Sequence, residues 1–258
     1  MATAHRALAD KNGVDLDNIT TRKAFQTPWS YRLPTLALVD GALDFPAPAA
    51  EHLTFLGPQI WRNRPHLAAA PDPGRFFARG DGKKRIYAGF GSMRRPPVRF
   101  IRALNQVAQA NPGWDILVAG DPDRLLPGTT PADNLQFAGW APQLDALDAA
   151  DCAIFHGGAG TFGECLATAT PMLICPNALD GKGNAARAQY HGIGMSGGYR
   201  DSPAKIARTL QQLMTSESTR SRLAQIQKRL ASVQASGHVA DVVGRLMRRN
   251  GANVRSPN

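Results

Sequence analysis

From residue 83 onward, the sequence alternates short apolar runs with longer segments in which hydrophobic residues recur at helical spacing. Runs of this length are typical of strands, and the segments between them are typical of amphipathic helices. Strands that alternate with helices form βαβ units with a parallel sheet and right-handed crossovers. This part of the chain is therefore predicted to be a doubly wound α/β domain. The predicted strands are 85–89, 115–119, 135–137, 152–155, 172–175 and, more weakly, 193–196.

The predicted helices fill the segments between these strands. Pro96 and Pro97 suit a first helical turn, because proline has no N–H to lose there. The remaining helices are expected at 144–150, 161–168, 184–190, 204–214, 220–234 and 241–249.

The chain before residue 83 has a different character. Residues 33–39 and the run that begins at Leu53 can each form one short strand. Residues 62–82 are rich in proline, glycine and charge, which is typical of a linker. We therefore expect an incomplete segment at 1–61, a linker at 62–82 and the α/β domain at 83–258.

The formal charge of +10 favours anionic partners, but the cations are scattered along the chain. Contact with a membrane surface is compatible with this charge. Nucleic-acid binding is not expected, since no aromatic residues interleave with a basic stripe.

Three cysteines without C-x-x-C spacing argue against disulfides and zinc. With no hydrophobic leader and no apolar run near the roughly 18 residues of a membrane span, a cytoplasmic location is expected.

Three loops that follow predicted strands have the character of a ligand site: 89–93, 155–161 and 175–180. In doubly wound sheets, ligands bind beyond the carboxyl ends of the strands. The glycines of His156-Gly-Gly-Ala-Gly-Thr161 let backbone amides approach an anion at the start of a helix. His156 and Thr161 can add hydrogen bonds. The loop matches neither the ATPase nor the usual dinucleotide pattern, and tight packing alone also explains such a turn.

Other side chains near these loops have two interpretations each. Trp140, followed by a proline, can present a flat face to a base or can be a core aromatic. Glu164 can accept hydrogen bonds from a ribose diol or can be a favourable charge in the first turn of a helix. Asp180 can accept from sugar hydroxyls or can be a turn residue.

Taken together, these motifs resemble the donor signature of the GT-B nucleotide-sugar glycosyltransferases. The resemblance runs from Trp140-Ala-Pro-Gln143 through His156-Gly-Gly-Ala-Gly-Thr-x-x-Glu164 to Asp180-x-x-x-Asn184. Bacterial macrolide glycosyltransferases look most similar, and plant secondary-product glycosyltransferases share the outline. The resemblance implies that residues 83–258 are the Rossmann-like C-terminal domain and that residues 1–61 are a remnant of the N-terminal acceptor domain.

The resemblance also implies roles for individual residues in binding a UDP-sugar. Trp140 would stack on the uracil, with Gln143 beside the base and ribose, and Glu164 would bind the ribose hydroxyls. Asp180 would face the sugar. The diphosphate would be held by Ser92, His156, Gly158, Gly160 and Thr161. The family usually has glutamine after the aspartate, whereas this chain has Gly181, so the identity of the sugar stays open.

The expected activity is transfer of a hexose from a UDP-sugar to a hydroxyl of a small lipophilic acceptor. The base that the family uses is an N-terminal histidine. His5, His52 and His66 do not match its setting, so no catalytic residue is assigned. The alternatives are an inactive UDP-sugar-binding module, a split enzyme completed by a separate acceptor-domain chain, and a related epimerase. Neither a cofactor nor a metal is expected, because the helix N-terminus and His156 can neutralise the leaving diphosphate.

Overall fold

The computed structural model describes residues 35–46, 53–61, 82–91, 95–177 and 180–251. The chain divides into two compact units, Met1–Gly57 and Pro58–Asn258. Most of the expected linker, and with it the expected domain boundary, lies outside the described residues. The boundaries at 61 and 82 therefore stay predictions.

The first unit contains two short parallel strands, β1 (Thr35–Ala37) and β2 (Leu53–Phe55). Both lie within the runs predicted from the sequence. A 3-10 helix, η1 (Gly41–Leu43), follows β1, and the side chain of Asp40 caps it by accepting from the N–H of Ala42. A Cβ atom at Gly41 would lie 2.6 Å from the ring of Phe55, so the turn packs closely on β2.

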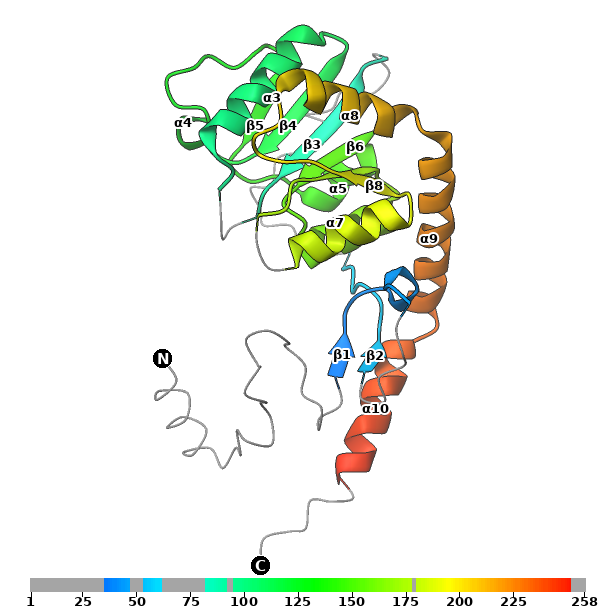
Figure 1. The fold of residues 1–258 in the computed structure, drawn as a ribbon. Coiled ribbons are helices and arrows are strands. Elements are labelled where there is room, and N and C mark those ends of the chain that lie inside the picture. The colour runs from blue at the N-terminus through cyan, green and yellow to red at the C-terminus, as the bar shows by residue number, and fades with distance from the viewer. Residues whose placement is uncertain (1–34, 47–52, 62–81, 92–94, 178–179, 252–258) are drawn as a thin grey trace, which may run out of the picture. The chain divides into compact units, whose positions relative to one another are not determined.

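The second unit is built on a six-stranded parallel sheet (Figure 1). The order of its strands is β5-β4-β3-β6-β7-β8, which is 3-2-1-4-5-6 when counted along the chain from β3. This is the order of the doubly wound nucleotide-binding folds, and it confirms the predicted fold class. The strands are β3 (Lys84–Gly89), β4 (Trp114–Ala119), β5 (Leu135–Ala138), β6 (Cys152–Phe155), β7 (Met172–Ile174) and β8 (Gly194–Ser196).

Helices connect these strands, and the longest ones follow the predicted segments to within a few residues. Pro97 is the N-cap of the first of them, so both prolines precede the helix, which begins at Val98, instead of forming its first turn. The short α4 (Pro122–Leu125) was not predicted. The other helices are α3 (Val98–Ala110), α5 (Gln143–Ala149), α6 (Ala159–Thr168), α7 (Gly181–Tyr190), α8 (Pro203–Thr215), α9 (Glu217–Ala235) and α10 (His238–Gly251).

Both faces of the sheet are buried, as expected for parallel strands. Ile86 and Ala88 of β3 belong to a core that also contains Leu104 of α3 and Leu210 of α8. The side chain of Tyr87 points to the opposite face, because successive strand residues alternate. Helix α5 packs against β3 on that face. The candidate site lies on this side of the sheet, at the carboxyl ends of the strands.

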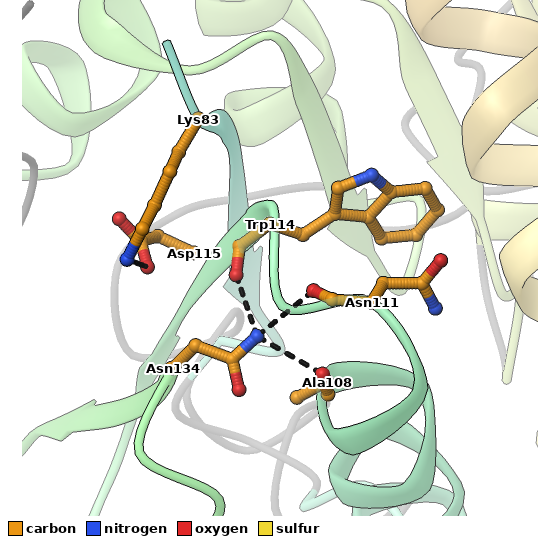
Figure 2. Close-up of polar contacts among 6 residues, drawn as sticks. All are labelled: Lys83, Ala108, Asn111, Trp114, Asp115 and Asn134. Atoms are coloured by element: carbon orange, nitrogen blue, oxygen red, sulfur yellow. Dashed lines mark hydrogen bonds and ion pairs between the residues drawn. The ribbon is translucent and has the colours of Figure 1, made fainter. Parts of the chain in front are cut away.

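The amino ends of β4 and β5 are connected to α3 by the side chain of Asn134 (Figure 2). The Nδ2 of Asn134 donates to the carbonyls of Ala108, Asn111 and Trp114 at 3.0, 3.0 and 2.7 Å. An open cavity of about 560 Å³ lies at the same edge. This edge is opposite the carboxyl ends of the strands, so Asn134 stabilises the domain at a distance from the predicted ligand loops.

Candidate functional site

The strand order places a topological switch point between β3 and β6, and we call the space beyond the carboxyl ends of these two strands the crevice. From these neighbouring strands, the chain continues toward opposite edges of the sheet, and such a switch point is where doubly wound folds bind ligands. Gly89 and Phe155, the last residues of the two strands, are register partners. The loops that begin at Phe90 and His156 therefore start side by side.

The ring of His156 lies between two glycines, one from each loop. A Cβ atom at Gly91 would be 2.9 Å from its Cε1, and a Cβ atom at Gly158 would be 2.7 Å from its Nε2. Gly91 also has a φ of +70°, which strains any other residue. Within the described part of the chain, the buried Nδ1 of His156 makes no hydrogen bond. The two glycines thus leave room for an imidazole at the rim of the crevice.

Helix α6 begins in the same loop, with Gly158 as its N-cap. The first amides of a helix, here including those of Gly160 and Thr161, have no acceptor within the helix. Because the N-cap is a glycine, no N-cap side chain accepts from them. The amide of Ala159 donates to Oδ2 of Asp180 at 2.8 Å. The start of α6 therefore presents backbone donors and the positive end of the helix dipole to the crevice.

The start of α7, which follows the third loop, packs closely on this turn through the backbone of two glycines. Gly157 has a φ of +91°, and a Cβ atom there would lie 2.7 Å from Cα of Gly181. A Cβ atom at Gly181 would lie 2.5 Å from the carbonyl oxygen of His156. The buried Asn184 secures the contact by donating to the carbonyl of Gly157 at 2.8 Å. The loops are too close for a side chain at position 181, which gives a physical reason for the glycine in this chain.

Gln143, the first residue of α5, connects three further polar groups. Its Oε1 accepts from the hydroxyl of Tyr87 at 3.0 Å, and its Nε2 donates to the hydroxyl of Thr161 at 3.2 Å. The same Nε2 donates to Oε2 of Glu164. Glu164 is only 6% exposed. Burial, followed by the negative charge of Glu164, raises the pKa of Tyr87, so its hydroxyl keeps its proton.

The structure thus links most of the predicted site residues by direct contacts. Gln143, Thr161 and Glu164 form one group, and His156 packs on Gly158. Trp140 lies between β5 and α5 and is 47% exposed, so it is not a core aromatic. Ser92 lies outside the described residues. Whether these residues bind a UDP-sugar stays a prediction.

Two residues of the site, Tyr87 and Asn184, were not assigned a role from the sequence. Tyr87 looks like an ordinary core aromatic in a strand, and no local signal shows that its hydroxyl reaches α5. Asn184 stands in the motif that carries the family resemblance, which was the available signal for it.

The family of the chain is now clear from its sequence. The family model described as "Erythromycin biosynthesis protein CIII-like, C-terminal domain" matches residues 108–247, more than half of the chain. The chain belongs to this EryCIII-like family of glycosyltransferases. Its matched region contains β5, β6 and β7 with the helices that start in the site.

Individual relatives agree with this assignment. The chain is 30% identical to oleandomycin glycosyltransferase of Streptomyces antibioticus over 168 residues. This alignment covers 62% of this chain and 38% of the relative. It is 28% identical to zeaxanthin glucosyltransferase of Pantoea ananas over 210 residues. That alignment covers 80% of this chain and 47% of the relative. The chain therefore spans less than half the length of both relatives.

A solved structure agrees with the fold. The kitacinnamycin glycotransferase superposes with a TM-score of 0.73 at 23% identity and covers 93% of this chain and 59% of that one. At this identity the likeness concerns the fold alone. The EryCIII-like chain thus has the GT-B type of architecture that its sequence predicts.

Neither a metal-binding cluster nor a membrane-spanning helix is found among the described residues. Asp121 and Asp123 form an Asp-x-Asp pair after β4, but Asp121 caps α4 and pairs with Arg124 at 3.2 Å. Across the described ranges, no group of at least three His, Cys, Asp or Glu residues is arranged to hold a metal. No helix in those ranges combines the length and apolarity needed to span a membrane. Cys152, Cys165 and Cys175 are free and buried.

Proposed function

We propose that this EryCIII-like chain binds the nucleotide of a UDP-sugar and supplies the donor side of a hexose transfer to the hydroxyl of a small lipophilic acceptor. The observation that carries the proposal is the crevice at the β3–β6 switch point. There, an imidazole lies beside the start of α6, whose N-cap Gly158 provides no side-chain cap. Backbone amides at a helix N-terminus, aided by the dipole, bind phosphate groups without lysine.

The nucleoside end of the ligand is supported by two features. Trp140 exposes nearly half of its surface beside α5, where a base can stack on the indole. Glu164 is a buried acidic group next to Gln143, and a carboxylate is a good acceptor for the two hydroxyls of a ribose. Because a deoxyribose lacks one of these hydroxyls, Glu164 favours uridine over thymidine nucleotides.

The acceptor class is supported by the relatives rather than by the site. One is named for the macrolide oleandomycin and another for zeaxanthin, which both suggest a lipophilic acceptor. The second name also suggests glucose as the sugar. The general base and the acceptor contacts are not assigned to residues of this chain. We propose the divisions 1–61 and 83–258 as the acceptor-side remnant and the donor domain.

Calorimetric titration with UDP tests the donor site. We expect His156→Ala and Glu164→Ala each to weaken UDP binding roughly tenfold to hundredfold, since each removes a hydrogen bond to or from a charged group. His238→Ala and the exposed Glu217→Ala are matched controls on α10 and α9, and they are expected to leave the affinity unchanged. Unchanged affinity in the two site variants would remove the proposed site.

Transfer itself is tested with UDP-glucose and a hydroxylated lipophilic acceptor such as a carotenoid or a macrolide aglycone. Product formation that survives EDTA supports a metal-independent transferase. UDP binding with neither transfer nor donor hydrolysis would instead support a binding module or a subunit that needs a separate acceptor domain. Loss of activity in EDTA with recovery in manganese would contradict the expected metal independence.

A further inference from the structure

We propose that Tyr87 is a positioning residue for ribose recognition: its hydroxyl orients the amide of Gln143, and this amide holds the carboxylate of Glu164 for the 2′-hydroxyl of the donor. This inference rests on the proposed function of the crevice as a UDP site. It assigns a role to a residue inside the sheet, 2% exposed, that would not touch the ligand.

Gly89 of β3 leaves the space through which the side chain of Tyr87 passes. Tyr87 and Gly89 lie on the same face of the strand, since they are two positions apart. A Cβ atom at Gly89 would lie 2.9 Å from both Cε1 and the hydroxyl oxygen of Tyr87. The ring therefore passes over the bare glycine toward the carboxyl end of the sheet. This path brings the Tyr87 hydroxyl to Gln143, the first residue of α5.

The hydrogen bonds fix one direction for the Gln143 amide. An ionised carboxylate can only accept, so the NH₂ group of Gln143 must be the side that faces Glu164. The carbonyl oxygen then faces Tyr87, whose hydroxyl donates to it at 3.0 Å. With the amide reversed, its oxygen would face the carboxylate and repel it. The tyrosine hydroxyl thus stabilises the orientation that supports Glu164.

A carboxylate that is held in place distinguishes a ribose from a 2′-deoxyribose better than a mobile carboxylate does. Rigid support removes the cost of ordering the side chain when the ligand binds. Glu164 receives this support from Gln143, which is itself held at both ends of its amide by Tyr87 and Thr161. The benefit is realised only with a ligand that has the 2′-hydroxyl. Loss of the Tyr87 hydroxyl should therefore weaken binding of the ribonucleotide selectively.

The test is calorimetric titration of the full chain with UDP and with 2′-deoxy-UDP. We expect Tyr87→Phe, which keeps the ring and removes the hydroxyl, to weaken UDP binding roughly three- to tenfold. Binding of 2′-deoxy-UDP should change less than about twofold. Tyr190→Phe removes the hydroxyl of a tyrosine that is 61% exposed on α7, and it should change neither affinity.

A double-mutant cycle separates positioning from a general structural effect. Gln143→Met keeps the length of the side chain without its hydrogen bonds, and adding Tyr87→Phe to it should cause no further loss of UDP affinity. If Tyr87→Phe alone proves poorly folded, Gln143→Met tests the same support of Glu164, and its loss of affinity should be larger for UDP than for 2′-deoxy-UDP. Equal losses for both nucleotides, additive effects in the cycle or unchanged UDP binding would each overturn the inference. A wild-type chain that binds neither nucleotide would instead remove the proposed function itself.

Discussion

The carboxylate of Asp180 accepts a hydrogen bond of 2.8 Å from the backbone N–H of Ala159, the first residue of α6. The sequence resemblance assigns Asp180 to the sugar, yet the structure places its carboxylate on the first amide of α6, next to Gly160 and Thr161, which are proposed to bind the diphosphate. A negative side chain at a helix N-terminus stabilises the helix. In the proposed function, Asp180 and the diphosphate therefore compete for the same positive end of α6.

The first prediction concerns this competition. In Asp180→Asn the side chain keeps an oxygen acceptor but loses its charge. We expect UDP to bind about two- to fivefold more tightly, because the like charge beside the phosphates is gone. UDP-glucose should gain less than UDP, since its sugar loses a charged acceptor. Titration with both ligands measures the difference. Asp133→Asn, an exposed change at the opposite edge of the sheet, should have no effect.

Much of the second unit could be predicted from the sequence, because strongly apolar strands and periodic helices are encoded locally. The predicted strand at 152–155 coincides with β6, and α7 and α10 begin only three residues earlier than predicted. The short α4 was missed, because its four residues are too few to show a period. Its start depends instead on capping by Asp121.

The site was less accessible from the sequence, because its geometry depends on residues far apart in the chain. The family resemblance assigned Gln143, Thr161 and Glu164 to one ligand, and the structure shows them in contact. The contribution of Tyr87 depends on an approach over Gly89 to a helix 56 residues away, which no local pattern encodes. Likewise, Gly181 was visible only as a departure from a motif. Its close contact with His156 supplies the reason.

The second prediction concerns the asparagine that fastens α3 to the sheet (Figure 2). Asn134→Ala leaves the carbonyls of Ala108, Asn111 and Trp114 without the amide that they share. The carbonyls of Ala108 and Asn111 still accept from the backbone N–H groups of Asn111 and Trp114, so they are not left without a donor. We expect the free energy of unfolding to fall by about 1–2 kcal/mol through the net loss of these hydrogen bonds. Urea unfolding measures the change. The neighbouring Asp133→Ala is exposed and should change stability by less than about 0.5 kcal/mol.

The third prediction concerns the end of α6. Ala169, its C-cap, has a φ of +54°, a left-handed conformation that disfavours a side chain. Ala169→Gly should therefore raise the free energy of unfolding by about 0.5–1 kcal/mol. The same exchange two residues earlier, Ala167→Gly, lies inside the helix and should lower it by about 1 kcal/mol. Opposite signs in parallel denaturation curves are the diagnostic result.

The last prediction concerns alkaline pH. Burial raises the pKa of the thiols of Cys152 and Cys175 from an ordinary 9.0 to about 12, and it also raises the pKa of the Cys165 thiol well above 9.0. Above pH 9 the unfolded chain releases thiol protons that the folded chain still holds, so the folded state binds more protons. The stability associated with these thiols is fully present below pH 9 and is lost as the pH rises toward 12.

Each buried thiol should contribute a loss of about 1.4 kcal/mol between pH 8 and pH 10, where the unfolded group titrates. Urea unfolding at the two pH values in the presence of a reductant measures this loss. Cys152→Ala removes one of the titrating groups, so its loss of stability should be smaller than that of the wild type by that amount. Since lysines and tyrosines titrate alike in both proteins, the difference isolates the thiol. An identical loss in the variant would mean that Cys152 ionises as readily in the folded chain as in the unfolded one.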